Sequence, residues 1–148
     1  MTTEINREAP AVARREIEIA ASPDTVWALH ADIGAWPDWH PDITAADPEG
    51  PLHIGSTFVW KSGPATITST LAVFDPPSRM LWMGRAMGTR ALHDWRFEPS
   101  ISGTRVVTEE SMEGWPVSLL RGFFQKTLDR SLDAWLAGLK ATAEERSG

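Results

Sequence analysis

His93 and Glu110 are the two residues whose types and spacing could carry acid–base chemistry together. Residues 89–98 alternate in character, which puts His93 on the same strand face as Trp95. Residues 104–113 alternate in the same way and put Glu110 on the inner face of the next strand. If the turn at 99–103 closes a hairpin, the imidazole and the carboxyl group lie opposite one another within cross-strand reach.

This pair has two interpretations. A carboxyl group beside an imidazole in an apolar pocket could act as a general acid and base, so both residues are catalytic candidates. Alternatively, the two form a satisfied polar pair in the interior, or one of them reaches solvent. In either case, they could orient a ligand hydroxyl or carbonyl group by hydrogen bonding.

Other kinds of chemistry have little support. The chain has no cysteine, which excludes disulfides and thiolate catalysis. The spacings of His30, His40, His53 and His93 match no zinc motif, and we expect His40 and His53 to face solvent. No nucleophile-elbow, phosphate-loop or dinucleotide motif occurs. We therefore expect no metal and no cofactor.

Composition limits the possible partners. The chain has 148 residues, a formal net charge of −6 and a pI of about 5.1, which argues against nucleic-acid binding. No apolar run reaches the ~18 residues that span a bilayer. Residues 1–11 are polar and lack the apolar stretch of a signal peptide, which favours a cytoplasmic protein. The oligomeric state stays open between monomer and homodimer.

The order of elements predicts an α+β domain. Residues 12–20 alternate like a half-buried strand, and Ser22 and Pro23 mark the start of a helix that ends at Gly34. A second short helical segment follows at 35–41. Further strands are predicted at 43–46, 57–61, 65–74, 79–85, 89–98 and 104–113, separated by Gly and Pro turns. Residues 117–143 have helical periodicity.

These elements imply one architecture. An antiparallel sheet of about six or seven strands must bury its apolar face against the only large amphipathic helix, the C-terminal one. We expect a single domain at 12–143, with flexible tails at 1–11 and 144–148.

Five motifs resemble those of a known superfamily, and together they cover residues 12–143. They are the strand into a capped helix at 17–27, Trp-Pro-Asp-Trp-His-Pro at 36–41, Gly-Ser-Thr-Phe at 55–58, Asp-Pro-Pro-Ser-Arg-Met-Leu-Trp at 75–82, and Gly-Thr-Arg-Val at 103–106. This order resembles the START and pollen-allergen-like helix-grip (SRPBCC) superfamily, in its polyketide cyclase/dehydrase-like branch. The resemblance implies a helix-grip fold: a curved sheet around a long C-terminal helix, with two short helices after the first strand.

The same resemblance implies a range of functions. Members bind lipids, sterols, quinones or polyketides, or assist other proteins, and a few catalyse cyclisation or dehydration. Fold alone does not choose among these. No catalytic set of the cyclase members carries over to this sequence residue by residue.

A bent sheet and a straight helix should leave a cavity between them, lined by inward side chains. Alternation in 65–74 points Ile67, Ser69, Leu71 and Val73 inward, whereas both faces of 79–85 are apolar and its inner face stays undecided. We expect Trp36 to plug one end. The candidate ligand-binding residues are Trp39, Phe58, Trp60, Ile67, Leu71, His93, Trp95, Glu110, Phe124, Leu128 and Ser131; Ser131 breaks the apolar stripe of the helix and leaves room there.

Three hypotheses about function follow. The first is a binding protein for an apolar, ring-containing or lipid-like small molecule. The second is an enzyme of the cyclase/dehydrase (aromatase-like) type with His93 and Glu110 as acid and base. The third is a protein-interaction or co-chaperone-like module, which would need an exposed apolar patch such as Trp115, Val117 and Leu119.

Overall fold

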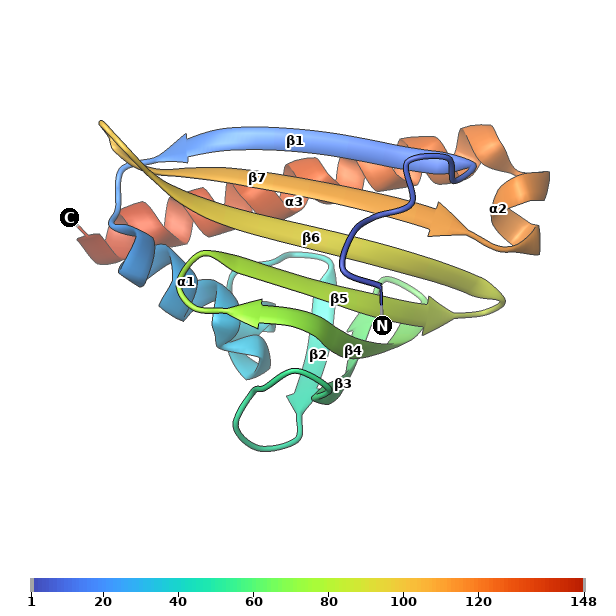
Figure 1. The fold of residues 1–148 in the computed structure, drawn as a ribbon, viewed down its shortest axis with the longest axis horizontal. Coiled ribbons are helices and arrows are strands. Elements are labelled where there is room, and N and C mark those ends of the chain that lie inside the picture. The colour runs from blue at the N-terminus through green and yellow to red at the C-terminus, as the bar shows by residue number, and fades with distance from the viewer. Residues whose placement is uncertain (1, 148) are drawn as a thin grey trace.

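A computed structural model describes residues 2–147. A single antiparallel sheet has the strand order β1-β7-β6-β5-β4-β3-β2 (Figure 1). Its strands are β1 (Ala11–Ile19), β2 (Ile43–Pro48), β3 (Thr57–Ser62), β4 (Ala65–Asp75), β5 (Arg79–Ala86), β6 (Thr89–Ser100) and β7 (Gly103–Glu113). The helices are α1 (Pro23–Ala31), the 3-10 helix η1 (Ile33–Asp38), α2 (Trp115–Leu119) and α3 (Arg121–Ser147).

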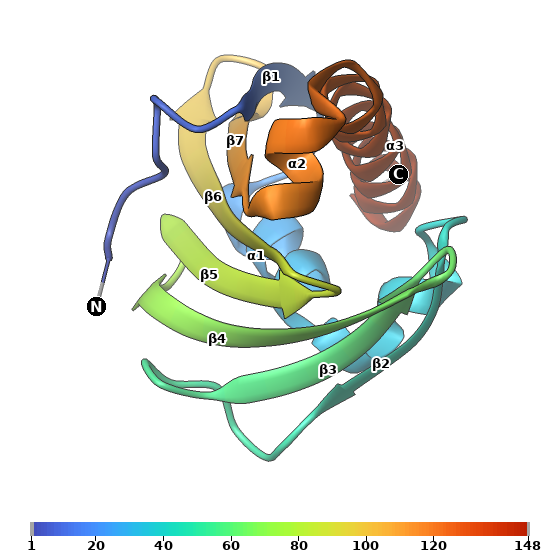
Figure 2. The same cartoon turned by 90° about the vertical axis from the view of Figure 1, so that its right-hand side faces the viewer.

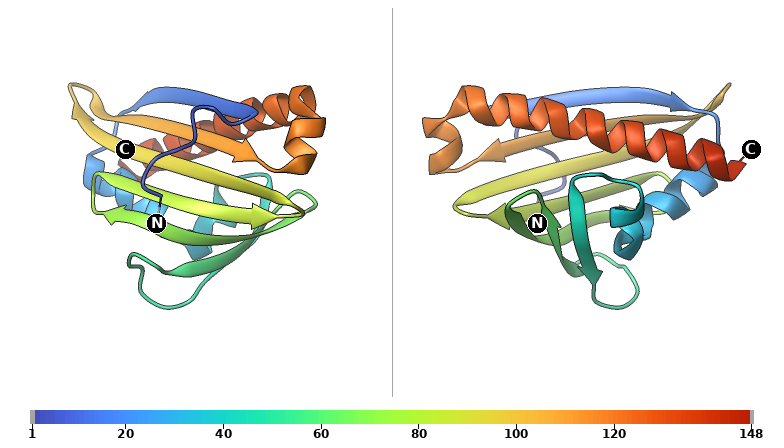
Figure 3. Two further views of the ribbon diagram at one scale, coloured as in Figure 1. Left: turned by 45° about the vertical axis from the view of Figure 1, so that its right-hand side comes forward. Right: turned by 180° about the vertical axis from the view of Figure 1, so that it is seen from behind.

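The sheet curves around α3. Figure 2 shows it bending from β1 and β7 at one edge to β2 and β3 at the other, with α3 on the concave side. Viewed from behind, in Figure 3, α3 crosses the full length of the sheet. The predicted α+β helix-grip fold is therefore confirmed. None of the helices in residues 2–147 is long and apolar enough to cross a membrane.

The first helix begins as predicted and ends earlier. The Ser22 hydroxyl accepts a hydrogen bond from the Thr25 N–H (3.2 Å), and Pro23 occupies the first turn. The prediction that the helix ends at Gly34 is wrong, because the backbone leaves the helical region at Asp32 (φ −81°, ψ 73°). η1 then brings Trp36 into the interior, where it is fully buried and its indole N–H donates to the His30 carbonyl (2.9 Å).

The C-terminal helix is broken once. One helix over 117–143 was predicted, but Leu120 leaves the helical region (φ −124°, ψ 51°) and separates α2 from α3. The break turns α2 across the end of the sheet and buries Val117 in a small cluster with Ala13 and Leu128. α3 also continues to Ser147, beyond the expected boundary at 143.

The fourth strand contains a bulge that changes its inner face. The β4–β5 register shifts between Leu71 and Val73. One extra residue reverses the alternation, so Val73 packs on the outer face and Phe74 contacts the core instead. The prediction that Val73 points inward is therefore wrong, whereas Leu71 is fully buried in the core.

The segment before β1, expected to be a flexible tail, contacts the outer face of the sheet. Ile5 is buried against Leu81 and Leu92 in a cluster on that face. The Asn6 N–H donates to the Ser111 hydroxyl (2.9 Å), and the Arg7 guanidinium pairs with Glu109 (2.6 Å). This cover explains why both faces of β5 are apolar. Met80 and Trp82 face the core, and Leu81 meets the N-terminal segment.

The main core fills only one half of the space between sheet and helix. Trp36 lies at its centre, with its ring 5.4 Å from that of Trp60, 5.3 Å from Trp82 and 4.9 Å from Trp135. α3 closes this half at Gly138, where a Cβ would lie 2.4 Å from the Trp39 carbonyl oxygen. Trp36 is fully buried, as its expected role requires, but it lies within the core and contacts rings on all sides.

We predict that Gly138→Ala destabilises the protein by about 1–3 kcal/mol, because the added methyl meets a backbone carbonyl that cannot move cheaply. Gly122→Ala in the same helix is the matched control, since a Cβ there meets nothing within 4 Å. Urea unfolding of both variants measures the difference. Equal stability of the two variants would show that α3 does not depend on this close approach.

Candidate functional site

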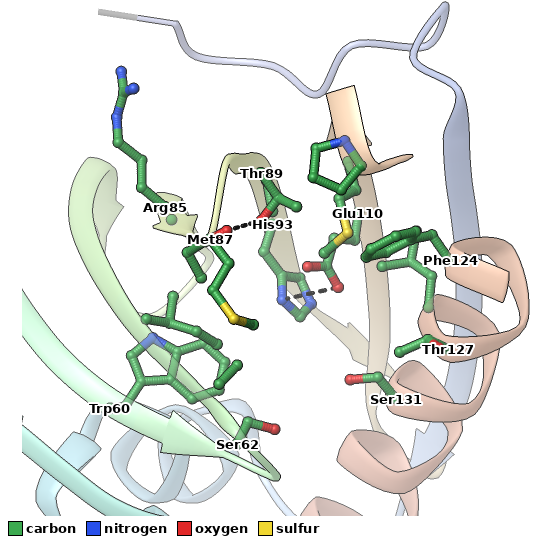
Figure 4. Close-up of a pocket in the computed structure, with 18 of the residues that line it drawn as sticks. Trp60, Ser62, Arg85, Met87, Thr89, His93, Glu110, Phe124, Thr127 and Ser131 are labelled. Carbon is green, nitrogen blue, oxygen red and sulfur yellow. Dashed lines mark hydrogen bonds and ion pairs between the residues drawn. The ribbon is translucent and has the colours of Figure 1, made fainter. Parts of the chain in front are cut away.

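The other half of the space between sheet and helix is a cavity of about 520 Å³. It lies between β3–β7 and the first turns of α3, with α2 and the β5–β6 turn at its mouth. Seven of the predicted ligand-binding residues line it: Trp60, Ile67, His93, Glu110, Phe124, Leu128 and Ser131. Figure 4 shows His93 and Glu110 on one wall, facing Ser131 of α3 and the Trp60 indole.

Four of the proposed ligand-binding residues lie elsewhere. Trp39, Phe58, Leu71 and Trp95 are buried in the main core and are not part of the cavity lining. Phe58, Leu71 and Trp95 point inward as alternation predicts, but the curvature of the sheet places them in the filled half. Trp39 follows η1 and is buried against Trp135.

The structure also adds residues that the sequence reasoning missed. Trp82 and Trp135 form the boundary between cavity and core, and Met87 and Trp115 lie at the mouth. Gly84 leaves space in the β5 wall, since a Cβ there would lie 3.1 Å from both Ile67 Cγ2 and Ser69 Oγ. A glycine inside a strand was the available signal for this close approach.

His93 and Glu110 are directly opposite partners in the β6–β7 register, which confirms the predicted juxtaposition. His93 Nδ1 lies 3.6 Å from Glu110 Oε1, and the two side chains are 1% and 12% exposed. This separation is longer than a hydrogen bond. The atoms face one another at the cavity wall, close enough for a small movement to join them.

Thr108 fixes which nitrogen of His93 carries the proton. The Thr108 hydroxyl donates to the Asp94 carbonyl (3.1 Å) and lies 2.8 Å from His93 Nε2. Because its one hydrogen is used on Asp94, the hydroxyl must accept from His93, so Nε2 carries the hydrogen. The lone pair of Nδ1 is then directed at Glu110.

Burial keeps both members of the pair neutral. Desolvation raises the pKa of Glu110 to about 8, so it is a protonated acid at neutral pH. Burial, with smaller contributions from His30 and His40, holds the pKa of His93 well below its ordinary value. The site thus offers an O–H donor facing an imidazole acceptor, a polar pair without formal charge.

Two further histidines lie in the core next to Trp135, which separates the core from the cavity. His30 is fully buried among aromatic rings, 4.3 Å from the Trp95 ring, and burial lowers its pKa to about 3. The prediction that His40 faces solvent is wrong: it is 2% exposed, because η1 folds it back against Trp135 with the rings 4.6 Å apart. His53 is exposed, as predicted. Among residues 2–147, no three His, Asp or Glu side chains are grouped so that they could hold a metal ion.

We predict that Glu110→Gln flattens the loss of stability at alkaline pH. The folded pKa of about 8 exceeds the ordinary 4.5, so the folded state binds a proton more tightly than the unfolded state. The stability from this group is complete below about pH 4.5 and is lost as pH rises toward 8. Glutamine stays neutral, so the variant should be more stable than the wild type by roughly 2–4 kcal/mol near pH 9 and should differ little near pH 5.

Urea unfolding across this pH range measures the effect. His30 and His93 act in the opposite direction below pH 6.5, because their folded pKa values are lowered. Both proteins contain these histidines, so the difference between them isolates Glu110. A constant difference at all pH values would contradict the raised pKa.

We predict that Thr108→Val leaves the His93 Nε2–H without its acceptor and destabilises the protein by about 1–3 kcal/mol. Thr68→Val on the exposed face of β4 is the control and should have little effect. The tautomer itself is measured by ¹⁵N NMR of the imidazole. A wild-type signal from Nδ1–H would contradict the assignment.

Comparisons with known proteins agree with this fold. A sequence profile for polyketide cyclase/dehydrase and lipid transport proteins matches residues 10–144. The Zhui aromatase/cyclase from Streptomyces sp. R1128 superposes with a TM-score of 0.82 at 16% identity, covering 93% of this chain and 95% of that one. A START superfamily protein from Mycobacterium smegmatis gives 0.77 at 16% identity, covering 90% and 97%.

A third structure shows that the fold also occurs within larger proteins. The di-domain aromatase/cyclase StfQ of the steffimycin biosynthetic pathway gives a TM-score of 0.79 at 18% identity. The match covers 93% of this chain and 52% of StfQ. A search of curated proteins found no match. At these identities the structural likeness shows the fold, while the profile match over most of its length shows that this chain belongs to the polyketide cyclase/dehydrase and lipid transport family, within the START-like SRPBCC superfamily.

Proposed function

We propose that this protein binds an uncharged, apolar, ring-containing small molecule in the cavity between the sheet and α3. The observation that carries the proposal is the chemistry of the wall: indoles and aliphatic groups surround one neutral acid–imidazole pair. A volume of about 520 Å³ lies in the range of small-molecule pockets, roughly 300–1,000 Å³. The relatives' association with polyketides and lipids supports the same class of ligand.

The pair favours a ligand that presents a carbonyl oxygen. The protonated Glu110 donates a hydrogen bond to such an oxygen, and the His93 lone pair accepts one from a neighbouring hydroxyl. A ligand carboxylate beside this pair would lose its hydration without a neighbouring cation, because Arg85, the one cation among the described lining residues, is exposed and points away from His93 and Glu110 in Figure 4. Planar quinones and phenolic ketones therefore fit this wall better than fatty acids do.

Filling the cavity tests the proposal. We predict that Ser131→Phe weakens binding of menadione, a neutral planar quinone, by at least about tenfold, because the ring occupies ligand volume. The control is Ala141→Phe, which introduces the same side chain at an exposed position of the same helix away from the cavity. Quenching of tryptophan fluorescence reports binding, since Trp60, Trp82 and Trp135 line the cavity. Equal affinity of the two variants, or decanoate binding more tightly than menadione, would overturn the proposal.

The affinity for menadione should also fall as pH rises through about 8, because the ionised Glu110 no longer donates a hydrogen bond. Menadione has no ionisable group, so the pH dependence belongs to the protein. Glu110→Gln keeps an N–H donor and should bind with an affinity that is independent of pH. A wild-type affinity that stays constant from pH 6 to about pH 9 would exclude Glu110 as the donor.

A second candidate function is dehydration of a cyclic β-hydroxy carbonyl compound. It is favoured by the opposed acid and base at the wall. Glu110 would protonate the leaving hydroxyl group while His93 Nδ1 removes the α-proton, which gives an alkene and water. The imidazolium would then return its proton to the Glu110 carboxylate, so the pair is regenerated.

This candidate predicts that His93→Ala abolishes turnover of a 3-hydroxy-tetralone-type probe while menadione binding persists. Mass spectrometry detects the loss of water from the probe. Turnover that survives in His93→Ala would leave the protein as a binding protein only.

A further inference from the structure

The mouth of the cavity is surrounded by large apolar side chains in contact with solvent. Met87, Trp115, Leu119, Leu120 and Phe123 are 73%, 72%, 72%, 52% and 64% exposed, and we call them the apolar tip. They come from the β5–β6 turn, α2, the break after it and the first turn of α3. Figure 1 shows α2 and the β5–β6 turn at the same end of the molecule.

The tip is one continuous surface that reaches the cavity. The β5–β6 turn touches α2, since a Cβ on Gly88 would lie 2.8 Å from the Trp115 indole nitrogen. Met87 and Trp115 also line the cavity. Phe123 stacks edge-on against Phe124 of the cavity wall, with ring centroids 5.3 Å apart. An apolar molecule could pass from the tip into the cavity along aromatic side chains.

Unpaired positive charge flanks the tip, although the chain carries a net charge of −6. Arg85, Arg121 and Lys126 stand on the segments that carry the tip, and none makes an ion pair with another residue in the described range. The carboxylates of the adjoining segments are already paired: Glu113 with Arg90 (2.8 Å) and Asp129 with Arg15 (3.4 Å).

From this arrangement we propose that the apolar tip docks on a membrane surface containing anionic lipids, with the cavity mouth facing the bilayer. The tip inserts apolar side chains below the headgroups, where a Trp is favoured, and the three cations meet lipid phosphates. The core of a protein–protein interface is poor in charged residues, whereas these exposed apolar side chains lie at one end of the molecule with cations beside them. The role of the docking in loading the cavity rests on the proposed function above.

Vesicle binding tests the inference. The protein should co-sediment with phosphatidylcholine vesicles that contain phosphatidylglycerol, and much less with phosphatidylcholine alone. The double variant Leu119→Gln/Phe123→Gln should bind at least about tenfold more weakly, because two exposed apolar anchors are lost. Ile101→Gln is the control, since Ile101 is fully exposed at the β6–β7 turn. If the double variant binds vesicles like the wild type, the inference is wrong.

Charge reversal tests the electrostatic part. Arg121→Glu/Lys126→Glu should remove the preference for phosphatidylglycerol, whereas Arg146→Glu, at the far end of α3, should keep it. Trp115 gives a direct readout, because the other seven tryptophans are buried. Its emission should shift to the blue with anionic vesicles, and the shift should be absent in Trp115→Phe. An unshifted wild-type emission would overturn insertion of the tip.

The same variants separate this inference from the proposed function. Leu119 and Phe123 do not line the cavity, so their double variant should bind menadione in solution like the wild type. If the wild-type protein binds menadione but does not bind vesicles, only the docking inference is refuted. If the wild-type protein binds vesicles but does not bind menadione, only the ligand proposal is refuted. The wild type could instead fail to bind vesicles and sediment as a dimer, with the double variant monomeric. That result would assign the tip to contact with a second copy and overturn membrane docking.

Discussion

The mismatch between a curved sheet and a straight helix governs this structure. α3 can be in close contact with the concave face over only part of its length. In the filled half, Gly138 lets the helix approach the backbone of the turn after η1 by admitting the Trp39 carbonyl. Around this point the indoles of Trp36, Trp82 and Trp135 fill the gap with edge-to-face and tilted contacts. Toward the N-terminal end of α3, Leu128 and Leu132 still pack on β1, but the helix and strands β3–β7 are separated by the cavity. The filled half supplies stability, and the open half supplies the cavity.

Glu110 and His93 form a neutral polar pair at the border between the filled half and the cavity. A carboxylate and an imidazolium at the edge of an aromatic core would both lose hydration, so burial favours their neutral forms. The Thr108 hydroxyl adds direction, because it leaves the Nδ1 lone pair facing the carboxylic acid. Neutrality lets the pair sit beside indoles without a counterion. It also matches the site to ligands that carry oxygen without charge.

Much of this arrangement could be predicted from the sequence. Two-residue alternation in β6 and β7, joined by a short turn, was enough to pair His93 with Glu110. The same rule failed at β4, because nothing in the local sequence marks a bulge beside Leu71. Alternation could not assign the inner face of β5, because the N-terminal segment buries its outer face as well. A strand buried on both faces is apolar on both, so it shows no two-residue period.

Local sequence patterns could not predict which inward side chains line the cavity and which fill the core. Phe58 and Trp60 share one face of β3, yet only Trp60 lines the cavity, since the curvature of the whole sheet decides which half a side chain enters. The break at Leu120 carries no proline or glycine at that position, so periodicity alone predicted an uninterrupted helix. α2 and the mouth of the cavity depend on that break.

The outer contacts of β7 have a consequence for the cavity on its other side. Glu109 and Glu110 are neighbours that point to opposite faces of the sheet. Glu109 is held by Arg7, which keeps the pKa of that carboxyl group low, and Asn6 is bonded to Ser111 on the same strand. Asn6 and Arg7 therefore hold β7 from the outer face of the sheet, on the strand whose inner face carries Glu110. A fusion partner or a cut within the first ten positions would remove these contacts, and the position of Glu110 in the cavity would then depend on β7 alone, although no residue of the cavity wall is altered.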